Sequence, residues 1–124
     1  NLSSYAIVCG TKPSLAALTA AGGRIDLGPG SVSATSGLMA FRAYQGGSIN
    51  INAAQTVTGA FSIVAYAAGG VVARSASTLP AISGAATGVR YSTTQCGVIY
   101  TAGAGPNYFP GDAAGMATAG GEYV

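Results

Sequence analysis

The sequence predicts an all-β fold, an antiparallel two-sheet sandwich or jelly roll of about eight short strands. Two observations predict it. Glycine pairs divide the middle of the chain at nearly even intervals, at Gly22-Gly23, Gly46-Gly47 and Gly69-Gly70. Short runs rich in Val, Ile and Tyr flank these pairs, and a Gly-Gly loop between two such runs is typical of a β-hairpin, because Gly readily adopts the positive φ of tight turns.

The elements follow in order from these signals. A short N-terminal helix is expected over residues 13–21, because Pro13 suits a first helical position, good helix formers follow, and Gly22 ends the run. The stretches "MAFRAYQGGSININ" and "SIVAYAAGGVVARSAS" are interpreted as hairpins. Two further strands are expected around Cys96-Gly97, in "TGVRYSTTQ" and "GVIYTA".

The spacing of the glycine pairs also fits a second architecture. A period of about 23 residues is compatible with a β-solenoid, in which each coil stacks on the next. The sandwich is preferred, because the three units share the placement of Gly but little side-chain identity. Beyond Ala102 the strand pattern stops. We therefore expect a β-sandwich domain over residues 1–104 and an extended C-terminal arm over residues 105–124.

Composition excludes several classes of protein. The 124 residues fit one domain, since domains typically run to about 100–200 residues. The chain is 49% hydrophobic and only 6% charged, whereas disordered chains combine low hydrophobicity with high charge. Its five cations are spread singly, which argues against a nucleic-acid partner, because such proteins cluster their Lys and Arg.

No membrane span is predicted either. The longest apolar run, residues 59–73, is interrupted by Ser62 and by a glycine pair. It is shorter than the roughly 20 residues that a membrane-spanning helix needs.

The residues that carry most enzyme chemistry are scarce. Histidine is absent, which removes the commonest general base and the commonest metal ligand. Asp112 and Glu122 could in principle divide acid and base roles as glycosidase carboxylates do, but both lie in a Gly-rich stretch and are interpreted as solvated loop charges. No catalytic, cofactor or metal site is predicted, and the protein is expected not to be an enzyme.

Two pairs of alternatives stay open at this stage. Cys9 and Cys96 are the two cysteines of the chain, and they would form a disulfide in an oxidising compartment or serve as small core residues in a reducing one. The seven tyrosines would supply contact area at an interface or cap strands in the core.

The last thirty-five residues, "RYSTTQCGVIYTAGAGPNYFPGDAAGMATAGGEYV", resemble the C-terminal segment of small virion proteins of tailed bacteriophages. The features they share are an Arg-Tyr opening, an aromatic-Pro-Gly-Asp turn and a Gly-Gly-x-Tyr close. The proteins that the chain resembles most are the capsid decoration, or cement, proteins of short-tailed phages. These are small jelly-roll or sandwich subunits that oligomerise on the shell and have no catalytic residues.

This resemblance implies a non-enzymatic structural protein on the outer capsid surface, whose partners are copies of itself and the major capsid protein. It further implies that the arm contacts a neighbouring subunit through Tyr108, Phe109, Pro110, Gly111, Tyr123 and Val124. Met116 is a further apolar anchor on the same segment. Small residues between the anchors would let the backbone lie close to its partner, and buried backbone groups of an extended arm must find hydrogen bonds there.

Two other functions remain as alternatives. A tail-fibre or spike tip that binds a host receptor would share the all-β, tyrosine-rich character, and copy number per particle would distinguish it from a decoration protein. A secreted pilus or surface-fibre subunit is less favoured, because the final residues alternate poorly between apolar and polar, unlike a donor strand.

Overall fold

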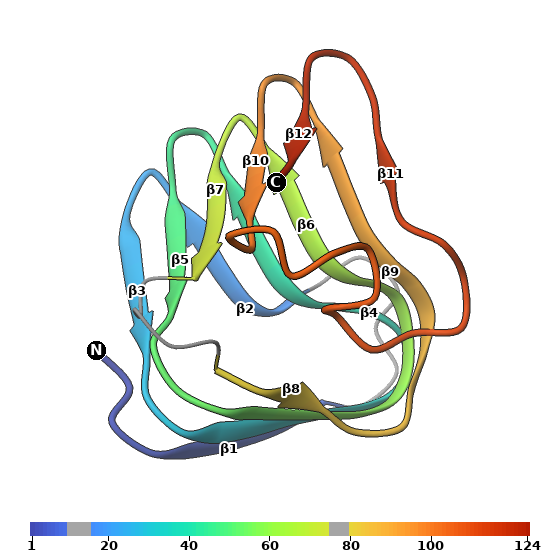
Figure 1. Ribbon diagram of the computed structural model, residues 1–124. Helices are drawn as coiled ribbons and strands as arrows, with labels where there is room; N and C mark the ends of the chain where they lie inside the picture. The colour runs from blue at the N-terminus through green and yellow to red at the C-terminus, as the bar shows by residue number, and fades with distance from the viewer. Residues whose placement is uncertain (10–15, 75–79) are drawn as a thin grey trace.

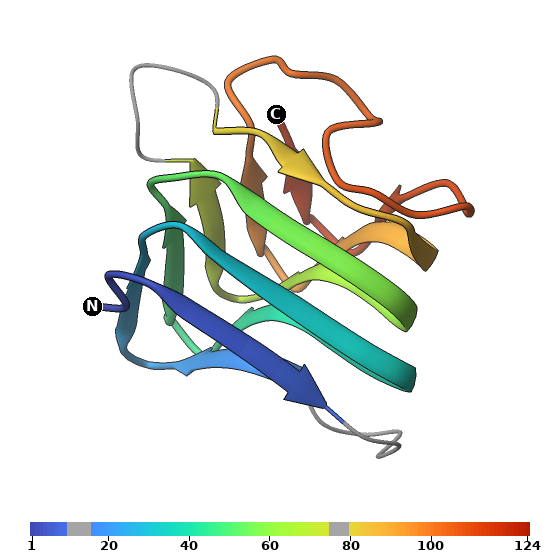
Figure 2. The same cartoon turned by 90° about the horizontal axis from the view of Figure 1, so that it is seen from below.

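The chain forms a β-solenoid, a stack of coils in which each strand pairs with the strand one coil away (Figure 1). The computed structural model describes residues 1–9, 16–74 and 80–124. Within these residues every strand pair is parallel. The axis of the stack runs from the N-terminal coil to the C-terminal segment, and these lie at opposite ends in Figure 2.

Two sheets make up the walls of the stack. The larger sheet holds seven strands: β1 (Tyr5–Cys9), β2 (Ala16–Ala21), β4 (Gly30–Tyr44), β6 (Gln55–Ala68), β8 (Ile82–Ser83), β9 (Ala86–Thr94) and β11 (Met116–Ala117). The smaller sheet holds five strands: β3 (Arg24–Leu27), β5 (Ser48–Ile51), β7 (Val71–Arg74), β10 (Val98–Tyr100) and β12 (Glu122–Tyr123). β4 is long enough to pair with β1 along its first half and with β2 along its second.

The register of the smaller sheet shows how regular the stack is. One row runs through Arg24, Ser48, Val71, Val98 and Glu122, one residue from each coil. The next position along each strand points inward and forms an apolar row: Ile25, Ile49, Val72, Ile99 and Tyr123. Ile49 and Ile99 are fully buried. Alternation along each strand thus builds the core one layer per coil.

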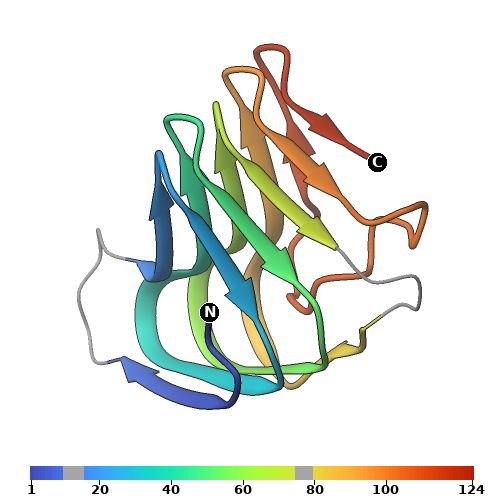
Figure 3. The same cartoon turned by 90° about the vertical axis from the view of Figure 1, so that its left-hand side faces the viewer.

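The glycine pairs form the corners between the two sheets. These corners lie side by side along the stack in Figure 3. The first residue of a corner has positive φ, as at Gly22 and Gly69. The second glycine lies against the backbone of the preceding coil. A Cβ atom on Gly47 would lie 2.3 Å from the carbonyl oxygen of Ala20, and one on Gly97 would lie 2.3 Å from that of Ala67. Only glycine therefore lets successive coils approach at this corner.

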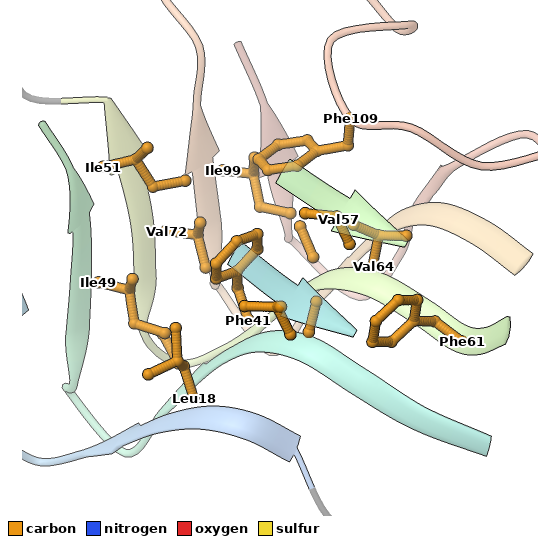
Figure 4. Close-up of a cluster of buried hydrophobic side chains, with 14 of the residues drawn as sticks. Leu18, Phe41, Ile49, Ile51, Val57, Phe61, Val64, Val72, Ile99 and Phe109 are labelled. Carbon is orange, nitrogen blue, oxygen red and sulfur yellow. The ribbon is translucent and has the colours of Figure 1, made fainter. Parts of the chain in front are cut away.

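The core fills the space between the sheets, and Figure 4 shows its side chains converging from both walls. Its largest fully buried members are aromatic and branched aliphatic: Phe41, Phe109, Leu27, Ile49, Ile51 and Ile99. Many alanines complete the inner face of the larger sheet, including Ala43 and Ala67, which are fully buried. Such small residues keep the coil narrow.

This fold corrects the predicted fold class. The antiparallel sandwich or jelly roll was wrong, since the described strands pair in parallel, and the glycine pairs are corners rather than hairpin turns. A corner and a hairpin loop both need positive φ next to a small residue, so the local signal is the same for both. The solenoid that the period also allowed is the architecture found.

Two further elements of that fold class are corrected. The helix expected over residues 13–21 is absent from the described part of that segment, where β2 pairs with β4 and alternately buries Leu18 and Ala20. Residues 13–15 lie outside the described residues. The segment 105–124, expected to extend as an arm, contributes β11 and β12 to the two sheets and completes a fifth coil.

Across the described residues, no helix is long and apolar enough to cross a membrane.

One buried hydroxyl gives a testable consequence. Thr93 is fully buried, and its Oγ1 atom lacks a hydrogen-bond partner. We expect Thr93→Val to raise the free energy of unfolding by about 1 kcal/mol, because it removes an unsatisfied polar group and keeps the shape of the side chain. Urea denaturation measures this change. A loss of stability in Thr93→Val would show that the hydroxyl has a partner in solution.

Candidate functional site

In the part of the chain that the structure describes, the N-terminal end of the stack carries an open sheet edge. On one side β1 pairs with β4 along its whole length. The Tyr5 amide donates to Pro29 O, and alternate residues of a parallel strand face the same neighbour. The backbone groups of Ala6 and Val8 therefore point away from the stack. The Val8 side chain is 84% exposed, so this edge offers both hydrogen-bonding groups and apolar surface.

The strand at this edge is held firmly from beneath. The Tyr5 ring lies against Gly30, where a Cβ would collide with it. The Tyr5 hydroxyl donates to Gln55 Oε1, and Gln55 Nε2 donates in turn to Gly28 O at 2.8 Å and Ala53 O at 2.9 Å. Burial raises the pKa of Tyr5 to about 12, so the donating hydroxyl stays protonated even in alkaline solution near pH 10, where an exposed tyrosine ionises. The edge is thus a fixed surface.

The smaller sheet presents charge at the same end. Arg24 Nε donates to both carboxylate oxygens of Asp26, at 2.8 and 3.0 Å, and Asn50 Nδ2 donates to Asp26 Oδ1 at 2.8 Å. The hydrogen bond from Asn50, followed by that from Arg24, lowers the pKa of the Asp26 carboxyl. Arg24 is 64% exposed. This side of the end is therefore polar, with a cation facing solvent.

The C-terminal end differs, because part of it is closed by the segment that follows β10. Phe109 from this segment is 1% exposed and lies 6.4 Å from Phe41, measured between ring centroids. The Tyr108 ring meets the Phe109 ring edge-on, and its hydroxyl donates to Pro80 O at 2.9 Å. This segment therefore covers the core with its own apolar side chains.

The rest of the C-terminal end keeps the regular corner geometry. The corner between β11 and β12 has positive φ at Ala119 and Gly120, and a Cβ on Gly121 would lie 2.5 Å from the carbonyl carbon of Thr93. Tyr123 stacks on Tyr91 with centroids 3.7 Å apart, and its hydroxyl donates to Gly105 O at 2.7 Å. Burial raises the pKa of Tyr123 to about 12.

The six apolar anchors predicted for the arm, which are the predicted contact residues other than Gly111, differ in exposure. Tyr108, Phe109 and Tyr123 make the contacts within their own chain described above, and Pro110 is half-buried. Met116 and Val124 are 51% and 47% exposed. Contact with a neighbouring subunit remains a prediction, and the exposed members of the set are the residues positioned to make it.

The carboxylates considered for catalysis are held in different places. Asp112 Oδ1 accepts a hydrogen bond from the Gly88 amide at 2.6 Å, beside the larger sheet. Glu122 is exposed on β12 of the smaller sheet. Among the described residues no group of three or more acids, cysteines or histidines is arranged to hold a metal ion.

The two cysteines belong to different coils. Cys9 is half-buried at the end of β1, and Cys96 is exposed in the corner before β10. Both are free thiols in this structure. Cys96 occupies the corner position that Gly22 and Gly69 fill elsewhere, with φ of 58°.

The residues that distinguish the two ends, Val8, Gly23 and Arg24, were not predicted as site residues. A signal for them exists in the chain. The glycine-pair spacing continues through Cys96-Gly97 to Gly120-Gly121, so five corners rather than three could have been aligned, and the first of them marks the end of the stack.

Comparisons with known proteins give no relative from which a function could be transferred to this chain. No family model, no curated protein and no solved structure matches the chain. The function must therefore be argued from the geometry of the two ends.

Proposed function

We propose that the protein is a non-enzymatic structural module of a virion surface, a decoration subunit held in place by strand pairing with its neighbours. One observation supports this most directly: within the described residues, β1 leaves one side of its backbone unpaired and exposes Val8. Natural proteins protect such edges with Lys, Pro or bulges, and "YAIVC" contains none of these protections. An edge left in this form is suited to pairing with another chain.

The virion context comes from the resemblance of residues 90–124 to small phage structural proteins. The low charge of the chain and its glycine-rich corners are consistent with a subunit that shares backbone contacts with neighbours. In this proposal the outer capsid surface is the location, and the capsid subunits and further copies of the chain are the partners.

We expect Val8→Lys to reduce the number of copies on the particle at least tenfold. A lysine on an edge strand is one of the devices by which proteins prevent pairing with another chain, and a tenfold change in occupancy corresponds to a loss of only about 1.4 kcal/mol. Quantitative mass spectrometry of gradient-purified particles, produced with the variant as the sole source of the protein, measures this number.

Val8→Thr is the matched control, because it preserves the branched shape and the strand preference without adding a charge. The side chain is exposed, so neither variant should change the free energy of unfolding by more than about 0.5 kcal/mol. Full occupancy of the particle by Val8→Lys would rule out pairing at this edge.

A fibre or spike subunit is the second candidate, and the solenoid itself favours it, because parallel coils extend along one axis. Copy number separates the two functions: a decoration protein is present in many copies per particle and a fibre tip in few.

A further inference from the structure

Gly23 is the exception among the corner glycines. Gly47, Gly70, Gly97 and Gly121 each lie so close to the preceding coil that a Cβ atom would come within 2.7 Å of its backbone. Among the described residues, no atom would lie within 4 Å of a Cβ added at Gly23, and the φ of Gly23 is not positive. Nothing in this described part of the chain requires glycine there. A glycine at this corner of the first coil is explained if a coil of another molecule packs against it.

The backbone of β3 has free groups on the same side. Ser48 N donates to Gly23 O and Asn52 N donates to Leu27 O. The backbone groups of residues 23, 25 and 27 therefore face the second coil, and those of Arg24 and Asp26 point the opposite way, toward the N-terminal end of the stack. The carbonyl oxygen of Asp26 already accepts a hydrogen bond from Leu2 N at 2.9 Å. The amide and carbonyl of Arg24 and the amide of Asp26 point to the open end of the stack.

β12 offers the complementary groups at the opposite end. Glu122 N donates to Gly97 O and Val124 N donates to Ile99 O, so the backbone groups of Tyr123 face away from the stack. If Arg24 of another copy lies opposite Glu122, its Asp26 amide meets the Tyr123 carbonyl and the Tyr123 amide meets its Arg24 carbonyl. This is the same alternation that joins β10 to β12.

Side chains match in that register as well. Arg24 and Glu122 occupy the same outward row of the smaller sheet, and both are exposed. Stacking places the cation of one copy beside the carboxylate of the next. The inward row continues too, because Ile25, which is half-buried, follows Tyr123. Charge and apolar surface are therefore both complementary between the two ends.

We propose that two copies of this chain stack head to tail, with the Gly23 corner and β3 of one copy seated on the β11–β12 corner of the other. Gly23 then lies against the backbone at Ala117 and Thr118, as Gly47 lies against Ala20 and Ala21. This inference rests on the structural role proposed above and names one partner for the same N-terminal end. The contact joins unlike surfaces, so it continues from copy to copy.

Sedimentation velocity of the purified full chain over a wide concentration range tests the proposal. We expect the average mass to rise continuously with concentration, without a plateau at the dimer, because each stacked copy leaves both kinds of end available. Gly23→Val should weaken association at least tenfold, the effect of about 1.4 kcal/mol, since its side chain would collide with the neighbouring coil. Circular dichroism melting should give the wild-type midpoint.

Ser36→Val is the matched control, because it adds the same side chain at an exposed position of β4, which is not one of the strands in the proposed contact. Charge reversal gives an independent test. Glu122→Arg should weaken association roughly two- to fivefold, as loss of an exposed ion pair does, and it leaves the pair of Arg24 with Asp26 in the same chain intact.

Three results would overturn the proposal: a monomer at every concentration, unchanged association of Gly23→Val, or a plateau at twice the chain mass, which indicates a symmetric dimer. None of these results contradicts the role of β1 on the particle. That role is tested separately by the occupancy of Val8→Lys, so the two proposals can fail independently.

Discussion

Phe109→Ala is expected to lower the free energy of unfolding by about 3–5 kcal/mol, the usual cost of removing a buried phenylalanine ring. The ring is 1% exposed and contacts Phe41 and Tyr108. Removing it leaves a cavity at the C-terminal end of the core, where the segment after β10 depends on this side chain for its attachment. Urea denaturation, followed by far-ultraviolet circular dichroism, measures the change.

Tyr108→Phe is the control for this prediction. It keeps the neighbouring ring and removes the hydroxyl that donates to Pro80 O, so its cost should be about 1 kcal/mol. A loss below about 1 kcal/mol for Phe109→Ala would mean that the ring is not part of the core in solution. The segment would then be free to act as the extended arm that its sequence predicts.

The all-β class could be predicted because its signals are local. Runs of Val, Ile and Tyr between glycine pairs identify strands and turns, whichever strands later pair with one another. Pairing is not local. Ile25, Ile49 and Val72 form one inward-facing row, but this row becomes visible in the sequence only when the corners are aligned first. Equivalent positions hold different apolar residues, and this variation hides the side-chain identity that would have favoured a solenoid.

The helix at residues 13–21 was predicted from intrinsic propensity, and β2 shows why propensity failed. Ala and Leu are among the best helix formers, but that preference is worth less than about 1 kcal/mol per residue, whereas pairing with β4 buries Leu18 and Ala20 on the inner face of the larger sheet. Tertiary packing exceeds such preferences easily. A strand made mostly of alanine is also what the narrow interior beside Phe41 accommodates.

The candidate site could be predicted only in part. Met116 and Val124 are exposed near the C-terminal end, where the sequence places contact residues, whereas Phe109 is buried. Pro106, Pro110 and the nearby glycines make this segment look like an irregular arm in the sequence. Its place in the core depends on the contact between Phe109 and Phe41, which lie far apart in the sequence. The open N-terminal edge could not be predicted without the solenoid. In a sandwich each strand would have other neighbours, so a different strand would lie at the edge of the sheet.

Gly47→Ala is expected to lower the free energy of unfolding by about 3 kcal/mol, at the upper end of the cost of overpacking. The new Cβ would lie 2.3 Å from the carbonyl oxygen of Ala20 and 2.6 Å from its carbonyl carbon. These are backbone atoms of the coil beneath, so the two coils must separate at the corner and strain the hydrogen bonds beside it. Urea denaturation of the dilute protein measures the loss.

Gly23→Ala is the matched control, because it makes the same chemical change at the equivalent corner of the first coil. No atom of residues 1–9, 16–74 and 80–124 lies within 4 Å of the Cβ that it adds, so we expect a change of at most about 0.5 kcal/mol in the dilute protein. Equal losses at the two positions would show that the cost comes from the backbone preference of glycine and not from the contact between coils. A large difference would identify the contact between coils as the cause of the loss.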